Sequence, residues 1–185
     1  MNKRIALTGG IACGKSLVTK YLNEFGVETI DADDVVHGLI PDPAERKRIA
    51  AEVFADPEKR RALEARLHPL VRQKIDEFLS SPSPTPSPLS STPFRIAIIP
   101  LLFETHWDSN YDIICCVSSS RENQIDRMLT TRGYSLEEAE ARLAAQMPVE
   151  EKAARSHYVI NNNGSADELK LEVEKFLNWL SSNHQ

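Results

Sequence analysis

The sequence predicts a three-layer α/β fold, with helices on both faces of a five-stranded parallel sheet. Five short apolar runs, each suited to a buried strand, alternate along the chain with segments whose apolar residues have helical spacing. A glycine-bearing loop joins the first apolar run to the first helical segment, which is the order found in a βαβ unit. The 185 residues and the hydrophobic content of 41% suffice for a single domain, 1–185, with a sizeable core.

The first βαβ unit begins at the N-terminus. Residues 4–7 form a short apolar run and predict a buried strand. Residues 15–25 predict a helix, and Gly26 ends it because glycine readily adopts the left-handed conformation that follows many helices. The apolar run 27–30 then predicts the second strand.

Acidic residues follow this second strand, in the sequence D-A-D-D that begins at Asp31. Because residues two apart share a face of an extended chain, we expect Asp31 and Asp33 to project together from the carboxyl end of the strand. Ligands bind at that end of an open α/β sheet. One aspartate also suits the N-cap of a helix near Val35, so we expect one cap and one catalytic carboxylate.

The middle of the chain predicts a helical insertion. Residues 43–79 are rich in charge and carry apolar residues at mostly helical spacing, within a subdomain that we place at 34–80. Asp56-Pro57 and His68-Pro69 are expected helix boundaries, because proline suits the first turn of a helix and restricts the residue before it. The Ser/Pro-rich segment 80–93 predicts an exposed, extended linker without chemistry.

The second half of the chain predicts three more strands and three more helices. The expected strands are the apolar runs 94–99, 113–117 and 157–160. The expected helices are 122–131, 136–146 and a last helix with apolar residues over 169–180. Gly133 is expected to end the first of these helices, and Ser135 with Glu138 forms a capping box for the second.

The segment from Thr8 to Ser16 reads T-G-G-I-A-C-G-K-S and matches the pattern G-x-x-x-x-G-K-[ST]. Its glycines allow backbone N–H groups to face a phosphate, and the helix that follows directs its positive end toward the same place. Lys15 supplies a charge for the β- and γ-phosphates, and Ser16 supplies a hydroxyl ligand for Mg²⁺. The segment therefore predicts a P-loop that binds a nucleoside triphosphate.

The helical insertion and an arginine-bearing helical hairpin after the fourth strand indicate a P-loop kinase fold with mobile parts. We place the hairpin in a lid region at 121–148. A switch GTPase is less favoured, because the sequence has no N-K-x-D motif to read guanine.

Charge and cysteine usage exclude several classes of protein. The net charge of −5 and the pI near 5.6 argue against a protein that coats nucleic acid. Three cysteines, two of them adjacent, suit neither a disulfide framework nor a zinc site and predict reduced thiols. The N-terminal residues show no hydrophobic signal region, and no apolar stretch is long enough to span a bilayer. We expect a cytoplasmic protein without membrane contact, whose oligomeric state the sequence leaves open.

Several motifs together resemble the dephospho-CoA kinase family over nearly the whole chain. They are T-G-G-I-A-C-G-K-S from Thr8, D-A-D from Asp31, H-P-L-V from His68, P-L-L-F-E from Pro100, the R-x-x-x-x-R pair Arg127 and Arg132, Gln146, and V-I-N-N-N-G from Val159. Many families share the first motif, whereas D-A-D followed by H-P-L-V and P-L-L-F-E is specific. The resemblance implies transfer of the γ-phosphate of ATP to the ribose 3′-hydroxyl of dephospho-CoA, the last step of coenzyme A synthesis, with Mg²⁺.

The resemblance also implies roles for individual residues. Those expected to line the ATP phosphates are Ala12, Cys13, Gly14, Lys15, Ser16 and Leu17. Those expected to act in catalysis are Asp33 as general base for the 3′-hydroxyl, Lys15, and Arg132, which meets phosphate oxygens when the lid closes. Those expected to contact the substrate are Thr8, Asp31, His68, Leu101 and Arg127, and Ser16 is the expected Mg²⁺ ligand.

Some of these roles have a purely structural alternative. Arg127, Arg132 and Arg142 would also suit a solvated basic face on two helices. Leu101 and Leu102 follow a strand, where apolar residues usually pack inward, so we favour core burial for both.

The sequence departs from the family pattern mainly on the acceptor side. Residues 38–41 lead almost directly into Arg46, where the family carries an additional helical stretch, so we expect a trimmed acceptor domain. Ala12 and Cys13 stand where the family prefers Gly and Ser, and the loop should tolerate both because Gly9 and Gly14 remain. Two other functions stay open: a related kinase for a smaller hydroxyl acceptor, and a non-catalytic ATP-binding module.

Overall fold

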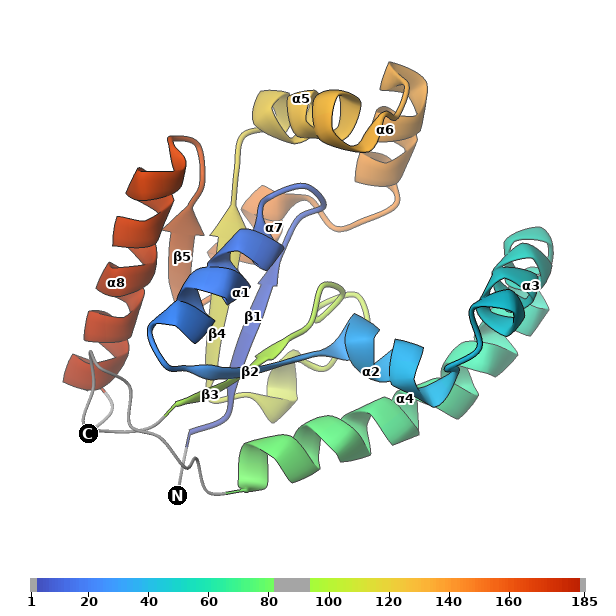
Figure 1. The fold of residues 1–185 in the computed structure, drawn as a ribbon, viewed down its shortest axis with the longest axis horizontal. Helices are drawn as coiled ribbons and strands as arrows, with labels where there is room; N and C mark the ends of the chain where they lie inside the picture. The colour runs from blue at the N-terminus through green and yellow to red at the C-terminus, as the bar shows by residue number, and fades with distance from the viewer. Residues whose placement is uncertain (1–2, 82–93, 184–185) are drawn as a thin grey trace. The chain divides into compact units, whose positions relative to one another are not determined.

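The computed structural model describes residues 3–81 and 94–183, and its sheet confirms the predicted fold class (Figure 1). The strands are β1 (Ile5–Gly9), β2 (Glu28–Asp31), β3 (Arg95–Ile98), β4 (Ile113–Ser118) and β5 (Tyr158–Asn161). They lie in the order β2-β3-β1-β4-β5, and β1 pairs in parallel with β3 and β4, as β4 does with β5. The phosphate loop therefore leaves the sheet from its central strand.

Helices cover both faces of this sheet. Helices α1 (Lys15–Glu24) and α8 (Ala166–Asn183) lie on one face, and α7 (Val149–Ala154) lies on the other (Figure 1). The central strands β1 and β4 lie in the core. Every residue of β1 and all but the last residue of β4 are buried, as expected for strands covered on both faces. The stripe Leu169, Val173, Phe176 and Leu180 of α8 packs into the same core. The six-residue helix α7 was not predicted from the sequence.

A helical hairpin follows β4 and lies beyond the carboxyl ends of β1 and β4 (Figure 1). It consists of α5 (Arg121–Arg132) and α6 (Leu136–Ala144). Gly133 ends α5 with a φ of 68°, and Ser135 and Glu138 form both bonds of a capping box at the start of α6. Both predictions from the local sequence are confirmed.

The chain divides into two compact units, one of Met1–Thr29 with Ser83–Gln185 and one of Ile30–Pro82. The second unit contains α2 (Ala32–Leu39), α3 (Pro43–Ala55) and α4 (Pro57–Ser80). Asp56 accepts hydrogen bonds from the backbone N–H groups of Glu58 and Lys59, so it caps α4 at the predicted Asp56-Pro57 boundary. Of the expected linker, Ser80 and Ser81 end α4, and residues 82–93 lie outside the described residues.

The predicted boundary at His68-Pro69 is wrong, because α4 continues through Pro69. Proline inside a helix removes one backbone hydrogen bond and costs about 3 kcal/mol. Leu67, Val71, Ile75 and Leu79 recur every fourth residue and form a buried stripe on either side of the proline. Burying four apolar side chains at about 1.5–3 kcal/mol each outweighs that cost.

Among the described residues, no helix combines the length and the apolar composition needed to cross a bilayer.

Candidate active site

The predicted phosphate loop connects β1 to α1 with a backbone that is partly left-handed. Gly9 and Gly14 have φ angles of 149° and 94°, where glycine meets no penalty. Ala12 also has a positive φ, of 57°, which costs an alanine about 1–2 kcal/mol. The expectation that the loop accepts Ala12 thus holds at the expense of some local strain.

Lys15 lies across this loop. Its Nζ donates hydrogen bonds to the carbonyl oxygens of Gly9 and Gly10, both at 2.9 Å. Ser16 is exposed in the first turn of α1, where the backbone N–H groups of a helix have no intrahelical partner. The loop therefore presents a positive side chain, a hydroxyl and the positive end of a helix to one place, which is the arrangement of an anion site.

Three side chains from outside the loop bind its backbone carbonyls. Gln124 Nε2 donates to Ile11 O at 2.7 Å, Arg127 NH1 to Ala12 O at 3.2 Å, and Asn162 Nδ2 to Cys13 O at 2.8 Å. Arg127, expected on the substrate, thus contacts the loop backbone, and Gln124 and Asn162 are loop contacts that the sequence did not predict. Asn162 lies within the motif V-I-N-N-N-G, which was the one available signal for it.

A cavity of about 330 Å³ opens beside the loop, which is within the size range of small-molecule sites. Its walls come from the loop, α5, α6 and the segment that leads into α7. The lining residues are Gly10, Ile11, Arg121, Gln124, Glu140, Leu143, Ala144, Gln146, Met147, Pro148, Val149 and Glu150. Gln146, one of the residues that carry the family resemblance, thus lies at a pocket next to the phosphate loop.

The arginines of the hairpin have different surroundings. Arg132 is exposed as the last residue of α5. Arg142 packs its guanidinium 4.3 Å from the centre of the Tyr134 ring, within the hairpin itself. That contact supports the structural alternative for Arg142, whereas the exposed position of Arg132 is compatible with a role on phosphates.

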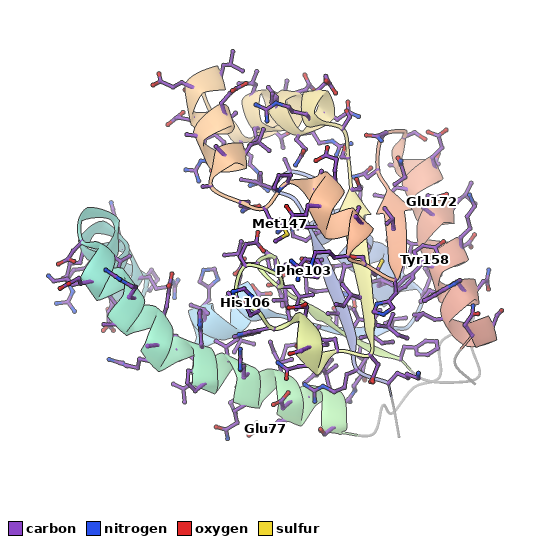
Figure 2. The ribbon with its side chains drawn as sticks, turned by 180° about the vertical axis from the view of Figure 1, so that it is seen from behind. Glu77, Phe103, His106, Met147, Tyr158 and Glu172 are labelled. Carbon is purple, nitrogen blue, oxygen red and sulfur yellow. The ribbon has the colours of Figure 1, made fainter. Side chains whose placement is uncertain are left out.

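A buried ion pair joins α7 to the loop after β3. Lys152 is fully buried, and its Nζ lies 2.7 Å from Glu104 Oε1 and donates to Pro100 O at 2.9 Å. Glu104 Oε1 also accepts from the backbone N–H of Met147 at 3.1 Å, at the end of the expected lid region. Met147 and Phe103 are labelled in Figure 2, and Arg155 NH1 lies 3.9 Å from Met147 Sδ. Arg155 packs 4.3 Å from the centre of the Phe103 ring.

Two of the expected substrate contacts, Thr8 and Leu101, belong to the compact unit that contains most of the sheet. Thr8 is fully buried, and its hydroxyl donates to Pro100 O at 3.3 Å. Leu101 is 38% exposed, whereas Leu102 is fully buried. The expectation of core burial is therefore confirmed for Leu102 and wrong for Leu101, because the chain turns after Pro100 and does not direct every apolar side chain to the interior.

Asp31 and Asp33 belong to the helical unit, and their predicted extended geometry is wrong. Asp31 ends β2 and accepts a hydrogen bond from the backbone N–H of Asp33 at 2.8 Å, which makes it the N-cap of α2. Asp33 lies in the first turn of that helix with its side chain exposed. The helix begins earlier than the run at Val35 suggested, because Asp31 provides the cap. One aspartate is a cap, as expected, and the other is open to solvent.

The carboxyl group of Asp31 has a perturbed environment. Partial burial raises its pKa, and the neighbouring carboxylates of Asp33 and Asp34 raise it further. The backbone hydrogen bond from Asp33 opposes the shift. His68, the other expected substrate contact in this unit, is half-buried within α4.

The three cysteines are free and buried, as expected for reduced thiols. Burial raises the pKa of all three thiols, and for Cys116 it raises the pKa to about 12. Lys15 acts in the opposite direction on the pKa of Cys13. Cys13 is therefore a neutral packing residue within the phosphate loop.

The described residues contain no group of three or more His, Cys, Asp or Glu side chains that would hold a metal ion. Mg²⁺ in phosphoryl-transfer sites is usually held by one or two protein oxygens together with substrate phosphates. The exposed hydroxyl of Ser16 at the loop fits that donor set.

A five-stranded parallel sheet with a phosphate loop after its central strand defines a P-loop kinase fold. Shikimate kinase from Acinetobacter baumannii shares the fold, with a TM-score of 0.64 over 100% of this chain and 96% of that one, at 18% identity. The dephospho-CoA kinase from Campylobacter jejuni is 26% identical, with a TM-score of 0.73 over the whole of both chains.

The family model for dephospho-CoA kinase matches residues 3–44 and 42–168. The dephospho-CoA kinase of Symbiobacterium thermophilum is 39% identical, over 92% of this chain and 78% of that protein. The chain belongs to the dephospho-CoA kinase family. It is therefore a kinase, an ATP-dependent phosphotransferase of the family that serves coenzyme A biosynthesis. The family match divides at residues 42–44, within the stretch where the sequence departs from the family pattern.

Proposed function

We propose that this protein transfers the γ-phosphate of ATP to the ribose 3′-hydroxyl of dephospho-CoA. The observation that carries the proposal is the folded phosphate loop, with Lys15 bound across the carbonyls of Gly9 and Gly10. Family membership supports dephospho-CoA as the acceptor. In the reaction, the 3′-oxygen bonds to the γ-phosphorus as the bond from that phosphorus to the β-phosphate oxygen breaks, which yields ADP.

The donor side of the reaction requires mainly positioning and charge neutralisation. Residues 12–17 would surround the ATP phosphates, and Lys15 would leave its carbonyl partners to meet the β- and γ-phosphates. Ser16 would hold Mg²⁺, which when bound would supply positive charge to neutralise the ATP phosphates. Arg132, exposed at the end of α5, would neutralise charge on the transferred group when the lid region 121–148 closes.

The acceptor side requires a base at the attacking hydroxyl. We assign this role to Asp33, because its carboxylate is exposed while Asp31 is engaged as a helix cap. A carboxylate within hydrogen-bond reach orients the hydroxyl and accepts its proton during transfer. The proton of the 3′-hydroxyl would thus move to the Asp33 carboxylate.

The remaining acceptor contacts follow from the family resemblance. We propose that Asp31, His68, Leu101 and Arg127 border the acceptor or phosphates, together with the buried Thr8, and that 34–80 is the acceptor subdomain. Leu101 is the apolar member of this set with exposed surface. We also propose a cytoplasmic enzyme without a nucleic-acid partner, for which the net charge of −5 is the support.

The test is phosphate transfer from ATP·Mg²⁺ to purified dephospho-CoA, with mass detection of CoA. Adenosine, AMP and pantetheine run beside it as other hydroxyl acceptors. We expect CoA to form and the other acceptors to react at least about a hundredfold more slowly, because they lack most of the binding contacts. Preferred turnover of a smaller acceptor would replace the proposed substrate, and ATP binding without any transfer would indicate a binding module.

A further inference from the structure

Three consecutive carbonyls of the phosphate loop are each bound by a different side chain. The donors are Gln124 on Ile11 O, Arg127 on Ala12 O and Asn162 on Cys13 O. They come from two separate segments, α5 and the turn after β5, that lie more than 100 residues from the loop in sequence. We call these three side chains the carbonyl clamp.

The clamp is itself held in place. Arg127 NH2 donates to Asn162 O at 2.7 Å, and its NH1 also donates to Ser119 Oγ at 3.1 Å. The single hydroxyl proton of Ser119 is shared between Asn162 O at 2.9 Å and Asn163 Oδ1 at 3.1 Å, and the backbone N–H of Asn162 donates to Ser118 O at 2.8 Å. Gln124 and Asn162 are only 3% and 6% exposed. The network is therefore shielded from water, where hydrogen bonds are strongest and unmade ones cost most.

The loop glycines give independent support for this arrangement. A Cβ at Gly14 would collide with Asn162 Nδ2, and a Cβ at Gly10 would lie 2.7 Å from Gln124 Nε2. These two glycines thus make room for clamp side chains in addition to shaping the loop. The shape of the turn alone would not require free space beside the side-chain amides of Asn162 and Gln124.

The clamp determines which way the loop N–H groups point. In a trans peptide the C=O and the next N–H point in opposite directions. The carbonyls of Ile11 and Cys13 point toward the side chains of Gln124 and Asn162. The N–H groups of Ala12 and Gly14 therefore point the opposite way, away from these side chains. The N–H of Cys13 closes a turn onto Gly10 O at 3.3 Å.

We propose that Gln124, Arg127 and Asn162 are positioning residues that hold the phosphate loop in its anion-binding conformation before ATP arrives. The proposal rests on the proposed function, in which ATP binds this loop. Without a clamp donor the peptide can rotate, so ATP must reorder the loop and binds more weakly. The bonds from Gln124 and Asn162 act on the loop that receives ATP, so we expect the KM for dephospho-CoA to stay unchanged when either of these two donors is removed.

The sharpest test compares Asn162→Asp with Asn163→Asp. Asn162 acts through its donor Nδ2, which an aspartate lacks. Asn163 acts through its acceptor Oδ1, which receives bonds from Ser120 N at 2.7 Å, Ser119 Oγ at 3.1 Å and Asn123 Nδ2 at 3.2 Å. An aspartate keeps those acceptor bonds. Both variants add the same charge one residue apart, but Asn162 is buried and Asn163 is exposed, so their difference combines the lost donor with the burial of the new charge.

A neutral variant keeps the test valid if the buried carboxylate of Asn162→Asp unfolds the protein. Gln124→Met has a similar shape and no donor, and Gln73→Met on the exposed surface of α4 is its control. For each protein we would measure the thermal midpoint without ATP, the Kd for ATP·Mg²⁺ by calorimetry, and the KM for each substrate.

We expect Asn162→Asp and Gln124→Met to raise the Kd and KM for ATP about tenfold, because each removes one buried hydrogen-bond donor from a loop carbonyl, and a tenfold change corresponds to about 1.4 kcal/mol. We expect Asn163→Asp and Gln73→Met to change them less than about threefold. Folded Gln124→Met with wild-type affinity for ATP would overturn the proposal, as would equal effects at Asn162 and Asn163. A wild-type protein that binds no ATP would overturn the proposed function as well.

Discussion

The phosphate loop and the helical unit Ile30–Pro82 hold their candidate site residues in different ways. In the loop, three consecutive carbonyls are bound by partners distant in sequence, and Lys15 is bound within the loop itself. In the helical unit, Asp33 is exposed in the first turn of α2, and the cap at Asp31 ties that turn down. The contrast indicates that the phosphate loop is pre-organised by the fold, whereas Asp33, in the role proposed for it, would gain its reaction partner from the substrate.

Loss of the exposed carboxylate should have the largest effect on catalysis. We expect Asp33→Asn to lower kcat about 1,000-fold, because the amide cannot accept the proton of the attacking hydroxyl. The Kd for ATP should stay within about twofold of wild type, since the loop keeps its own contacts. Steady-state kinetics and ATP calorimetry on the same preparation measure both.

Asp34→Asn is the matched control, because Asp34 is the adjacent exposed carboxylate in the same helical turn. We expect its kcat to change less than about threefold. Near-normal turnover in Asp33→Asn, or equal losses at both positions, would contradict the assignment of Asp33 as the base.

Removal of the buried lysine should have the largest effect on stability. Lys152→Met leaves Glu104 without its cationic partner, and we expect the free energy of unfolding to fall by about 3 kcal/mol. Lys59 of the helical unit also faces a carboxylate, at 3.8 Å from Glu52 Oε2, but both side chains are about half exposed. Lys59→Met should change stability by less than about 0.5 kcal/mol. Urea unfolding measures both, and similar values would show that burial does not distinguish the two pairs.

A methyl group in the phosphate loop should have a smaller but clear effect. Gly14→Ala places a Cβ against Asn162 Nδ2 at a φ of 94°, which an L-residue rarely adopts. We expect a loss of about 2 kcal/mol in stability, together with a raised Kd for ATP. Urea unfolding and calorimetry would detect these changes, and a variant with unchanged values would show that the loop is not tightly packed.

The same substitution should have the opposite sign in the helical unit. A Cβ at Gly38 of α2 meets nothing within 4 Å. Gly38→Ala should therefore stabilise the protein by about 0.5–1 kcal/mol, because alanine loses less backbone entropy than glycine in a helix. Thermal and urea unfolding against wild type provide the measurement. A destabilised variant would contradict the expected opposite signs of this substitution in the two regions.

Local sequence signals predicted the elements whose causes are local. The apolar runs became the strands, and the caps at Asp56 and Ser135 lie where their short-range hydrogen bonds place them. The prediction at Pro69 was wrong because burial of residues on both sides of it outweighs a local preference. The extended geometry assumed for Asp31 and Asp33 was wrong because the first aspartate starts a helix at once.

Three features of this protein could be predicted from its residues alone: the sheet of alternating strands and helices, the phosphate loop with Lys15 and Ser16, and the family to which the chain belongs. Each depends on periodicity or on spacing within a few residues, which can be read directly. The folded chain was needed to show that Gln124 and Asn162 bind the loop carbonyls and that Lys152 pairs with Glu104. Those contacts join residues 48 to 149 positions apart, and no local pattern encodes which distant donor reaches which carbonyl.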